Sequence, residues 1–161
     1  VWMIIDWSKF GKPTLIGLVT GTIAGLASIT PASGSVGPIG ALIIGASAGI
    51  ICYLFVNIVK NKLRIDDSLD VFAVHGIGGL IGILLVAFLV DSNIGGAGYA
   101  DGLNAISQLL IQLKGTFAVL VLSVVASIII TYVVKFTVGL RVDESSEVEG
   151  LDISSHGETN G

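Results

Sequence analysis

Long apolar stretches interrupted by short polar segments dominate this chain. No charged residue lies between Lys12 and Lys60, although one membrane-crossing helix needs only about 20 residues. Segment 30–38 divides the stretch, because it contains two prolines and two glycines, which interrupt helices. The pattern therefore predicts two membrane spans, over about 14–30 and 38–59.

Two further spans are predicted in the second half of the chain, over about 68–90 and 115–134. Between them we expect a short, separate amphipathic helix at the membrane interface. Its apolar residues repeat with the 3.6-residue period of a helix, at positions 103, 106, 109, 110 and 113. The predicted fold class is an all-α membrane protein, a polytopic bundle of about four transmembrane helices.

The composition supports a membrane protein and divides the chain in two. Charged residues make up 12% of the sequence and hydrophobic residues 53%, whereas soluble domains carry roughly 25% charged residues. Residues 1–140 hold seven bases and six acids, and residues 141–161 hold one base and six acids. We therefore expect a membrane domain over 1–140 and an acidic tail over 141–161, with no nucleic-acid partner.

The beginning of the sequence predicts that the polypeptide continues upstream. Five apolar residues precede Asp6, and neither Met nor a basic leader comes first. Five residues cannot cross about 30 Å of hydrocarbon. We expect them to be the last turns of an earlier helix, so that the chain is the C-terminal part of a longer protein.

The basic residues predict the orientation in the membrane. With four spans, seven of the eight bases fall on the side that holds the 60–67 loop and the tail, and only Lys114 falls on the other. Lysine and arginine accumulate on the cytoplasmic side. We therefore expect a multi-pass protein of the plasma membrane with a cytoplasmic C-terminus.

Glycines at four-residue spacing predict close contacts between helices, because small residues let helix backbones approach in lipid. They occur in the first three predicted spans, as Gly17, Gly21 and Gly25, as Gly45 and Gly49, and as Gly78 and Gly82. Cys52 is expected to pack inside the bundle, whereas Asp6 and Tyr53 are expected to be anchors at the membrane interface.

Segment 66–79 holds the residues that most strongly suggest chemistry. Asp66 and Asp67 suit the start of a helix, where carboxylates bond free N–H groups, and Asp70 is expected to be hydrogen-bonded within the bundle. His75 lies deeper in the span, where ionisable groups often mark a substrate or proton path. The spacing to Gly79 and Gly82 places it on the closely packed face of an α-helix.

Other roles for this histidine remain open from the residues alone. It can be satisfied by a carbonyl of a neighbouring helix, or it can ligate haem, although His156 in the polar tail is no candidate for a second axial ligand. The sequence has no phosphate-binding glycine loop and no Cys/His cluster. We expect no metal and no cofactor.

Three segments resemble the ammonium transporter (ammonia channel) family. They are GKPTLIGLVTGTIAGLASITPASG (11–34), DDSLDVFAVHGIGG (66–79) and VGLRVDESSEVEGLDISSHGE (138–158). The resemblance implies an eleven-helix fold of two inverted repeats, assembled as a homotrimer with one pore per subunit. It implies a transporter of ammonium or ammonia, not an enzyme, of which this chain is the end of helix seven and helices eight to eleven.

The resemblance also implies roles for individual residues. His75 resembles the second pore histidine of the family, and Val71 and Ile23 resemble apolar residues that line the pore. Ala73 stands where the family usually has glycine, which we expect to change packing only. The tail resembles the segment that meets a P-II-type signalling protein or transmits its signal, at Gly150, Leu151, Asp152 and His156.

The implied mechanism agrees with the cost of moving charge into hydrocarbon. An ammonium ion entering an apolar pore pays a large desolvation penalty, whereas ammonia, after loss of the proton, passes as a neutral molecule. Two alternatives are an ammonium sensor with the same membrane fold and a structural or haem-binding helix bundle. The short tail argues against the sensor, because no signalling domain follows it in this sequence.

Overall fold

The structure is a computed structural model that describes residues 1–158. Within that range all regular elements are helices, and four helical stretches are long and apolar enough to cross a membrane. They are Leu15–Ala32, Pro38–Lys62, Phe72–Leu89 and Ala105–Thr137. The predicted all-α fold with four spans is confirmed.

The chain forms two compact units, Val1–Phe117 and Ala118–Gly161, with the boundary inside the last long helix. The predicted division at 140/141 stays a prediction, and its last three residues lie outside the described range. The first unit contains, in order, α1 (Trp2–Phe10), α2 (Leu15–Ile29), η1 (Thr30–Ala32), α3 (Pro38–Asn57), η2 (Ile58–Lys62), η3 (Phe72–Ile77), α4 (Gly78–Leu89) and η4 (Ser92–Ile94).

Local sequence signals explain where the first two spans begin and end. α2 starts after Thr14, whose hydroxyl oxygen accepts a hydrogen bond from the backbone N–H of Gly17 at 2.9 Å, a typical N-cap. Pro31 and Pro38 each occupy the first turn of a helix, in η1 and α3, where a missing N–H costs nothing. The break predicted over 30–38 is therefore the real corner between the two spans.

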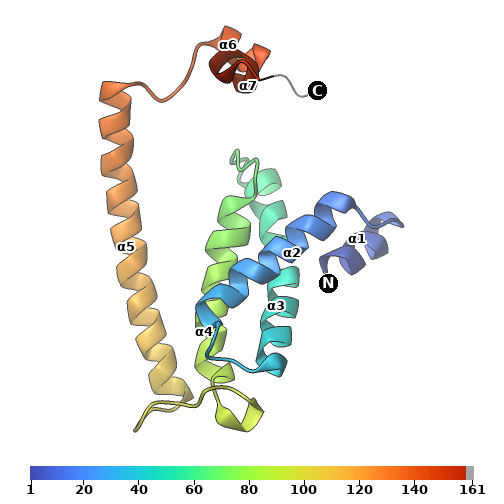
Figure 1. The fold of residues 1–161 in the computed structure, drawn as a ribbon, viewed down its shortest axis with the longest axis vertical. Coiled ribbons are helices and arrows are strands. Elements are labelled where there is room, and N and C mark those ends of the chain that lie inside the picture. Colours follow the sequence, from blue (N-terminus) through green and yellow to red (C-terminus); the bar gives the residue numbers. More distant parts are fainter. Residues whose placement is uncertain (159–161) are drawn as a thin grey trace. The chain divides into compact units, whose positions relative to one another are not determined.

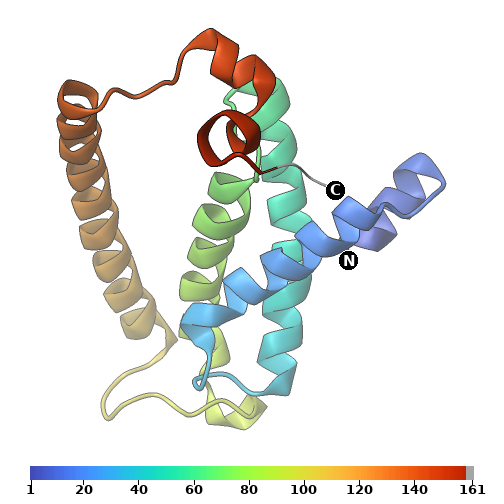
Figure 2. The same cartoon turned by 45° about the horizontal axis from the view of Figure 1, so that its top comes forward.

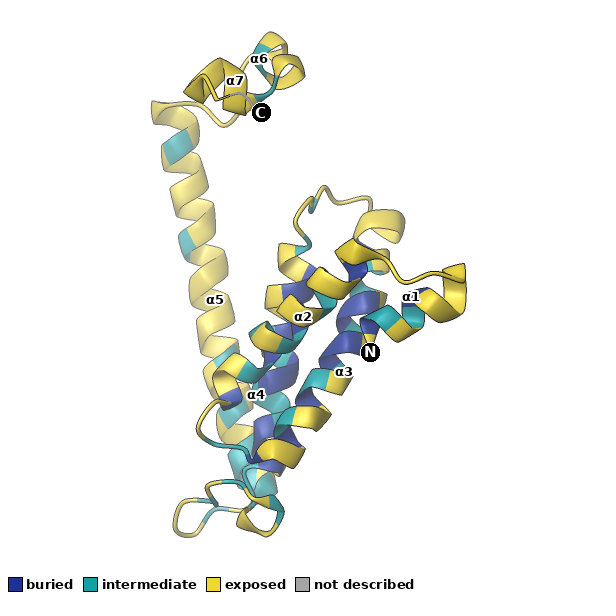
Figure 3. Ribbon diagram, turned by 45° about the vertical axis from the view of Figure 1, so that its right-hand side comes forward, coloured by how far each residue is buried: buried dark blue, intermediate teal, exposed yellow. Residues whose placement is uncertain are grey.

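Three helices form the core of the first unit. α3 and α4 run side by side in opposite directions, and α2 crosses both of them (Figures 1 and 2). The buried residues lie where these helices face one another (Figure 3). One cluster contains Trp2, Ala24, Ala48, Cys52, Tyr53, Val74 and Ile81, and a second contains Ala32, Ile44, Val86 and Leu89. Cys52 is fully buried, so its predicted packing role is confirmed.

α2 and α4 make a close contact that depends on glycine. A Cβ atom at Gly82 would lie 1.9 Å from the backbone oxygen of Ser28, and one at Gly78 would lie 2.8 Å from its hydroxyl oxygen. The predicted role of small residues is confirmed at these positions. It stays a prediction for Gly25 and Gly45, because within residues 1–158 no side chain and no other helix lies within 4 Å of a Cβ built there.

α1 is held against the core by polar and aromatic contacts. Trp2 packs edge-on against Tyr53, with ring centroids 5.2 Å apart, and Lys9 Nζ lies 4.6 Å from the centre of the tyrosine ring. Asp6 is 4% exposed and accepts a hydrogen bond from the Thr14 hydroxyl at 2.5 Å. The prediction that Asp6 and Tyr53 are interface anchors is therefore wrong, since both side chains are buried between helices.

The separate amphipathic helix predicted before the fourth span does not exist. α5 (Ala105–Thr137) is one continuous helix of 33 residues, about 50 Å long at the usual rise. It starts at Asn104, whose side-chain oxygen accepts bonds from the N–H groups of Ile106 and Ser107 at 3.0 Å. Lys114 and Gly115 do not end it, because a lone glycine is tolerated within a helix.

Adding one methyl group at the α2–α4 contact should destabilise the protein. We expect Gly82→Ala to cost about 1–3 kcal/mol or more, because the added carbon has no space against the Ser28 carbonyl. Gly79→Ala is the matched control on the same helix, since nothing lies within 4 Å of that site. Thermal unfolding of the purified protein in detergent measures both, and equal midpoints for the two variants would contradict this packing.

Candidate functional site

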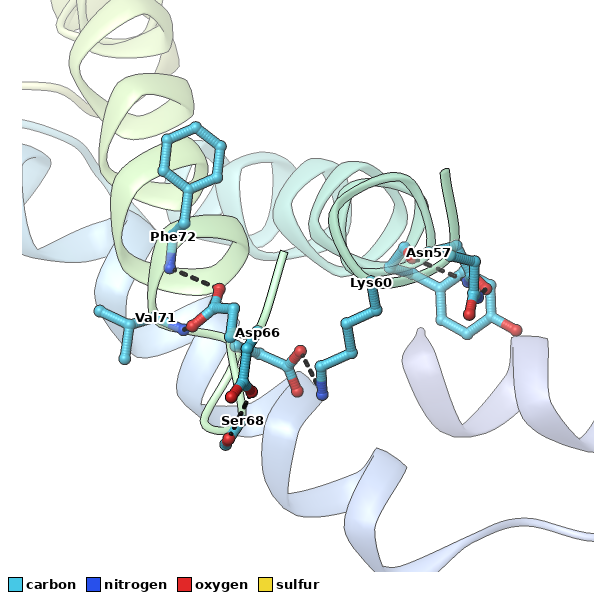
Figure 4. Close-up of polar contacts among 10 residues, drawn as sticks. Asn57, Lys60, Asp66, Ser68, Val71 and Phe72 are labelled. Carbon is cyan, nitrogen blue, oxygen red and sulfur yellow. Dashed lines mark hydrogen bonds and ion pairs between the residues drawn. The ribbon is translucent and has the colours of Figure 1, made fainter. Parts of the chain in front are cut away.

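The loop between α3 and the helix of His75 is shaped by carboxylates. Both oxygens of Asp67 accept backbone bonds at the helix start, from Val71 N–H at 2.8 Å and Phe72 N–H at 3.0 Å (Figure 4). This is the capping arrangement that the sequence predicts. Asp66 instead accepts a bond from the Ser68 hydroxyl at 2.9 Å, so it stabilises the loop and makes no bond to the helix.

Asp70 lies at the entrance to this helix and forms an ion pair. Its Oδ1 atom is 2.8 Å from Lys60 Nζ. Lys60 belongs to η2, the π-helical turn that follows α3. Asp70 has a φ of 56°, so the third span starts only after it and not at residue 68. The sequence predicts a hydrogen bond inside the bundle for Asp70, and the structure gives it a lysine from the adjacent helix end.

His75 lies in η3, a π-helical segment, and its side chain is exposed. Its neighbours Ala73 and Val74 are the residues that face the core. His75 therefore does not share the packed face of Gly82 within this chain, contrary to the expectation. Gly79, one α-helical turn after the histidine, does not lie on that face either, since a Cβ built there has open space around it.

The other two predicted pore residues are also exposed. Val71 is 51% exposed and Ile23 on α2 is 40% exposed, although the adjacent Ala24 is fully buried. α2 and η3 are in contact. The structure thus brings together the two helices that carry Ile23, Val71 and His75, and it leaves all three side chains outside the core formed by the described helices.

The tail carries a second set of predicted residues, in the second unit. Gly150 separates α6 (Glu144–Glu149) from α7 (Leu151–His156) and has a φ of 98°, a conformation that favours glycine. Asp152 lies in the first turn of α7 and His156 is its last residue. Leu151 is 46% exposed. These four residues therefore form a turn and a short helix, with exposed side chains at Leu151, Asp152 and His156.

Asp143 initiates the tail helices. Its carboxylate accepts bonds from the hydroxyls of Ser145 and Ser146 and from the backbone N–H of Ser146. These bonds, that of Ser145 first, lower the pKa of Asp143 from 3.8 to about 2. Because the folded pKa lies below the unfolded one, the cap stabilises α6 above about pH 4 and is lost as the pH falls toward 2.

The described residues offer no obvious place for a metal. No three His, Cys, Asp or Glu side chains within residues 1–158 gather closely enough to hold an ion.

Lys60 is a functional candidate that the sequence analysis did not single out. A signal was present, because Lys60 and Asp70 flank a short loop between two antiparallel helices, where their ends must meet.

Comparisons with known proteins identify the family. The profile of the Ammonium Transporter Family matches residues 1–161. The chain belongs to the ammonium transporter family. It is 45% identical over 158 residues to the ammonium transporter of Aquifex aeolicus and 45% identical over 159 residues to ammonium transporter Amt1 of Archaeoglobus fulgidus. The alignments cover 98% of this chain, but only 37% and 40% of those two ammonium transporters.

Solved structures give the same fold. The chain superimposes on a protein described as "Sensor Amt Protein" with a TM-score of 0.82 and 30% identity, over 94% of this chain and 37% of that one. It superimposes on Mep2 of Saccharomyces cerevisiae with a TM-score of 0.72 and 35% identity, over 89% of this chain and 38% of that one. The chain thus has the fold of a little over one third of these membrane proteins.

Proposed function

We propose that the full-length protein carries ammonium across the plasma membrane as ammonia, through a pore to which this chain contributes His75. The observation that carries the proposal is the exposed imidazole on a membrane-spanning helix of an ammonium transporter family member. An ionisable group within a span is costly unless it faces a cavity or another protein surface. Exposure on this chain therefore fits a residue that the rest of the protein covers.

The residues around His75 suit the passage of a neutral molecule. Val71 and Ile23 present apolar surface, which does not replace the hydration shell of an ion. A neutral imidazole both donates and accepts one hydrogen bond, so His75 can hold ammonia or pass a proton to a partner. The pore then rejects ions by desolvation and admits ammonia by size and hydrogen bonding.

The three acidic residues before His75 have a structural role in this proposal. Asp67 caps the helix and Asp66 stabilises the loop, while Asp70 pairs with Lys60. Together they fix the end of the helix that carries Val71 and His75. This assignment needs no cofactor and no enzymatic step. The ammonium ion only loses a proton before it crosses as ammonia, and no other bond of the transported molecule is broken or formed.

The proposed assembly is a homotrimer of eleven-helix subunits in the lipid bilayer, with a cytoplasmic tail. What supports it is the family and the two Amt and Mep2 folds that this chain matches in part. The orientation is supported by the charge count, since seven of the eight bases share the side of the tail. A P-II-type signalling protein is the proposed partner of the tail, at Gly150, Leu151, Asp152 and His156.

A second candidate function is ammonium sensing. The likeness to a protein described as "Sensor Amt Protein", with a TM-score of 0.82, favours it. Sensing and transport differ in turnover, because a sensor needs to bind ammonium but need not release it on the other side. Uptake by cells that lack their own ammonium transporters therefore separates the two functions.

Replacing His75 tests the proposed transport in the full-length protein. We expect His75→Ala to insert and assemble but to show strongly altered uptake of ammonium or methylammonium, because the pore loses a hydrogen-bonding group while the packed residues Ala73 and Val74 stay in place. We expect His75→Glu, which keeps a titratable group, to retain more transport. Uptake of labelled methylammonium measures both variants. Wild-type uptake by the alanine variant, with loss of assembly only, would show that His75 has a structural role.

Deleting residues 143–161 tests the proposed role of the tail. The deletion removes α6, α7 and the Asp143 cap but no membrane span. We therefore expect normal amounts of protein in the membrane, with a changed uptake rate or a changed response to nitrogen supply. Asp143→Ala, which removes only the cap, should give a weaker change in the same direction. If both variants transport and respond as the wild type does, the regulatory assignment is wrong.

A further inference from the structure

The end of α3 and the start of the His75 helix are joined by one ion pair across a short loop. Lys60 lies in η2, directly after α3, and Asp70 lies two residues before η3. The ammonium and the carboxylate approach to 2.8 Å, and Figure 4 shows the lysine side chain extending from one helix end to the other. The proposed function names Lys60 only as the partner of Asp70 and gives the lysine no part in transport.

The Asp70 carboxylate depends on this lysine. The side chain is 15% exposed, and its Oδ1 atom is shielded from solvent. Apart from Lys60 Nζ at 2.8 Å, this atom has no polar partner within residues 1–158. Lys60 Nζ is therefore the group that offsets its charge. Removing one partner of a sheltered ion pair is much more costly than the pair is worth, because a desolvated charge is left behind.

This pair differs from an ordinary surface ion pair. Arg141 and Glu147 are also close, at 2.6 Å, but their side chains are 77% and 42% exposed. Exposed pairs contribute little, because water screens them. Lys60 is 38% exposed, so its end of the pair reaches solvent, whereas the Asp70 side chain is 15% exposed and its Oδ1 atom is shielded from solvent. The dependence is therefore one-sided: the position of Asp70 requires Lys60 more than Lys60 requires Asp70.

The backbone of Asp70 adopts an unusual conformation at the start of the His75 helix, so the position of its side chain affects how the helix begins. Its φ of 56° lies in the left-handed region, which residues other than glycine rarely adopt and which Asp and Asn tolerate best. Asp70 N–H donates to the Asp67 carbonyl at 3.1 Å, and the Asp70 carbonyl accepts from Val74 N–H at 2.8 Å. The chain thus turns from loop into helix at Asp70, and its φ sets the direction in which the helix starts.

The residues after this turn are the proposed pore residues. Val71 follows Asp70 directly, and His75 lies four positions after Val71, in the π-helical turn η3. Single π-helical turns occur mostly within α-helices and frequently at functional sites. A different φ at Asp70 would start this helix in another direction and would change where the side chains of Val71 and His75 face.

We propose that Lys60 is a positioning residue for the pore: through its ion pair it holds the left-handed turn at Asp70 and so fixes the direction in which Val71 and His75 face. The inference rests on the proposed function, because it takes His75 to line the pore. In this proposal Lys60 influences which molecules the pore admits, although it lies outside the pore. Among the described contacts, Lys60 makes none with His75.

Uptake by variants of the full-length protein tests the proposal. Lys60→Met and Asp70→Asn should each lower the maximal methylammonium uptake roughly tenfold and change the ratio of ammonium to methylammonium transport, at wild-type amounts of membrane protein. The double variant should be no worse than the poorer single one, because both remove one interaction. Lys60→Arg should retain most transport. Lys62→Met, which removes a lysine from the same turn, is the matched control and should behave as the wild type.

Three results would overturn the inference: an unchanged transport ratio in Lys60→Met, additive losses in the double variant, or an equal loss in Lys62→Met. If Lys60→Met fails to insert, Lys60→Met combined with Asp70→Gly should restore insertion and part of the uptake, since glycine adopts the left-handed turn without a carboxylate. Failure of that rescue would also overturn it.

A second measurement separates this inference from the proposed function. Hydrogen exchange at the Val71 and Phe72 amides should be faster in Lys60→Met than in Lys62→Met, because the cap at Asp67 loosens when the turn at Asp70 is released. A wild-type protein that does not transport ammonium at all would overturn the proposed function. Unchanged exchange in Lys60→Met would overturn the positioning role of Lys60, whatever the uptake.

Discussion

The arrangement of the first unit depends on the contact between α2 and α4, where the backbone oxygen of Ser28 occupies the space that a side chain at Gly82 would need. In lipid the hydrophobic effect does not drive helices together, so packing of this kind is a main source of association. The contact sets the distance between the two helices. Ile23 and His75 are carried by α2 and by the helix that leads into α4, so the same contact determines how far apart they lie.

The polar residues act mainly at the ends of helices. Asp6 receives the Thr14 hydroxyl at the corner between α1 and α2, Asp67 caps the helix of His75, and Asp70 pairs with Lys60. Asp67 and Asp70 lie where free backbone groups or chain turns need a partner, whereas Asp6 lies within α1 and bonds to the N-cap residue of α2. The apolar side chains buried between the spans hold the helices together. The charged side chains near the helix ends fix where each helix begins and how it is rotated.

Much of this arrangement follows from the sequence, because hydrophobic length and proline position are local signals. They predict the four spans and the corner at 30–38, and Cys52 packs as expected. What sequence reasoning missed depends on helix type or on tertiary contacts. The π-helical turn at His75 gives no compositional signal. The exposure of His75 beside the buried Ala73 and Val74 depends on which side of this turn meets α2 and α3. The burial of Asp6 requires knowing that α1 folds back on α2. The continuity of α5 is a different case, because the sequence does hold the signal: Lys114 and Gly115 are not strong helix breakers.

The central claim is that this chain is part of a conducting pore for ammonia, with the exposed surface of Val71 and His75 on its wall. Reconstitution of the purified full-length protein into vesicles tests it most directly. When ammonium chloride is added outside, ammonia that enters takes up protons, so the account predicts a faster rise of internal pH than in empty vesicles, and a rate that falls in the His75→Ala protein. Vesicles with wild-type protein that alkalise no faster than empty ones would contradict the account.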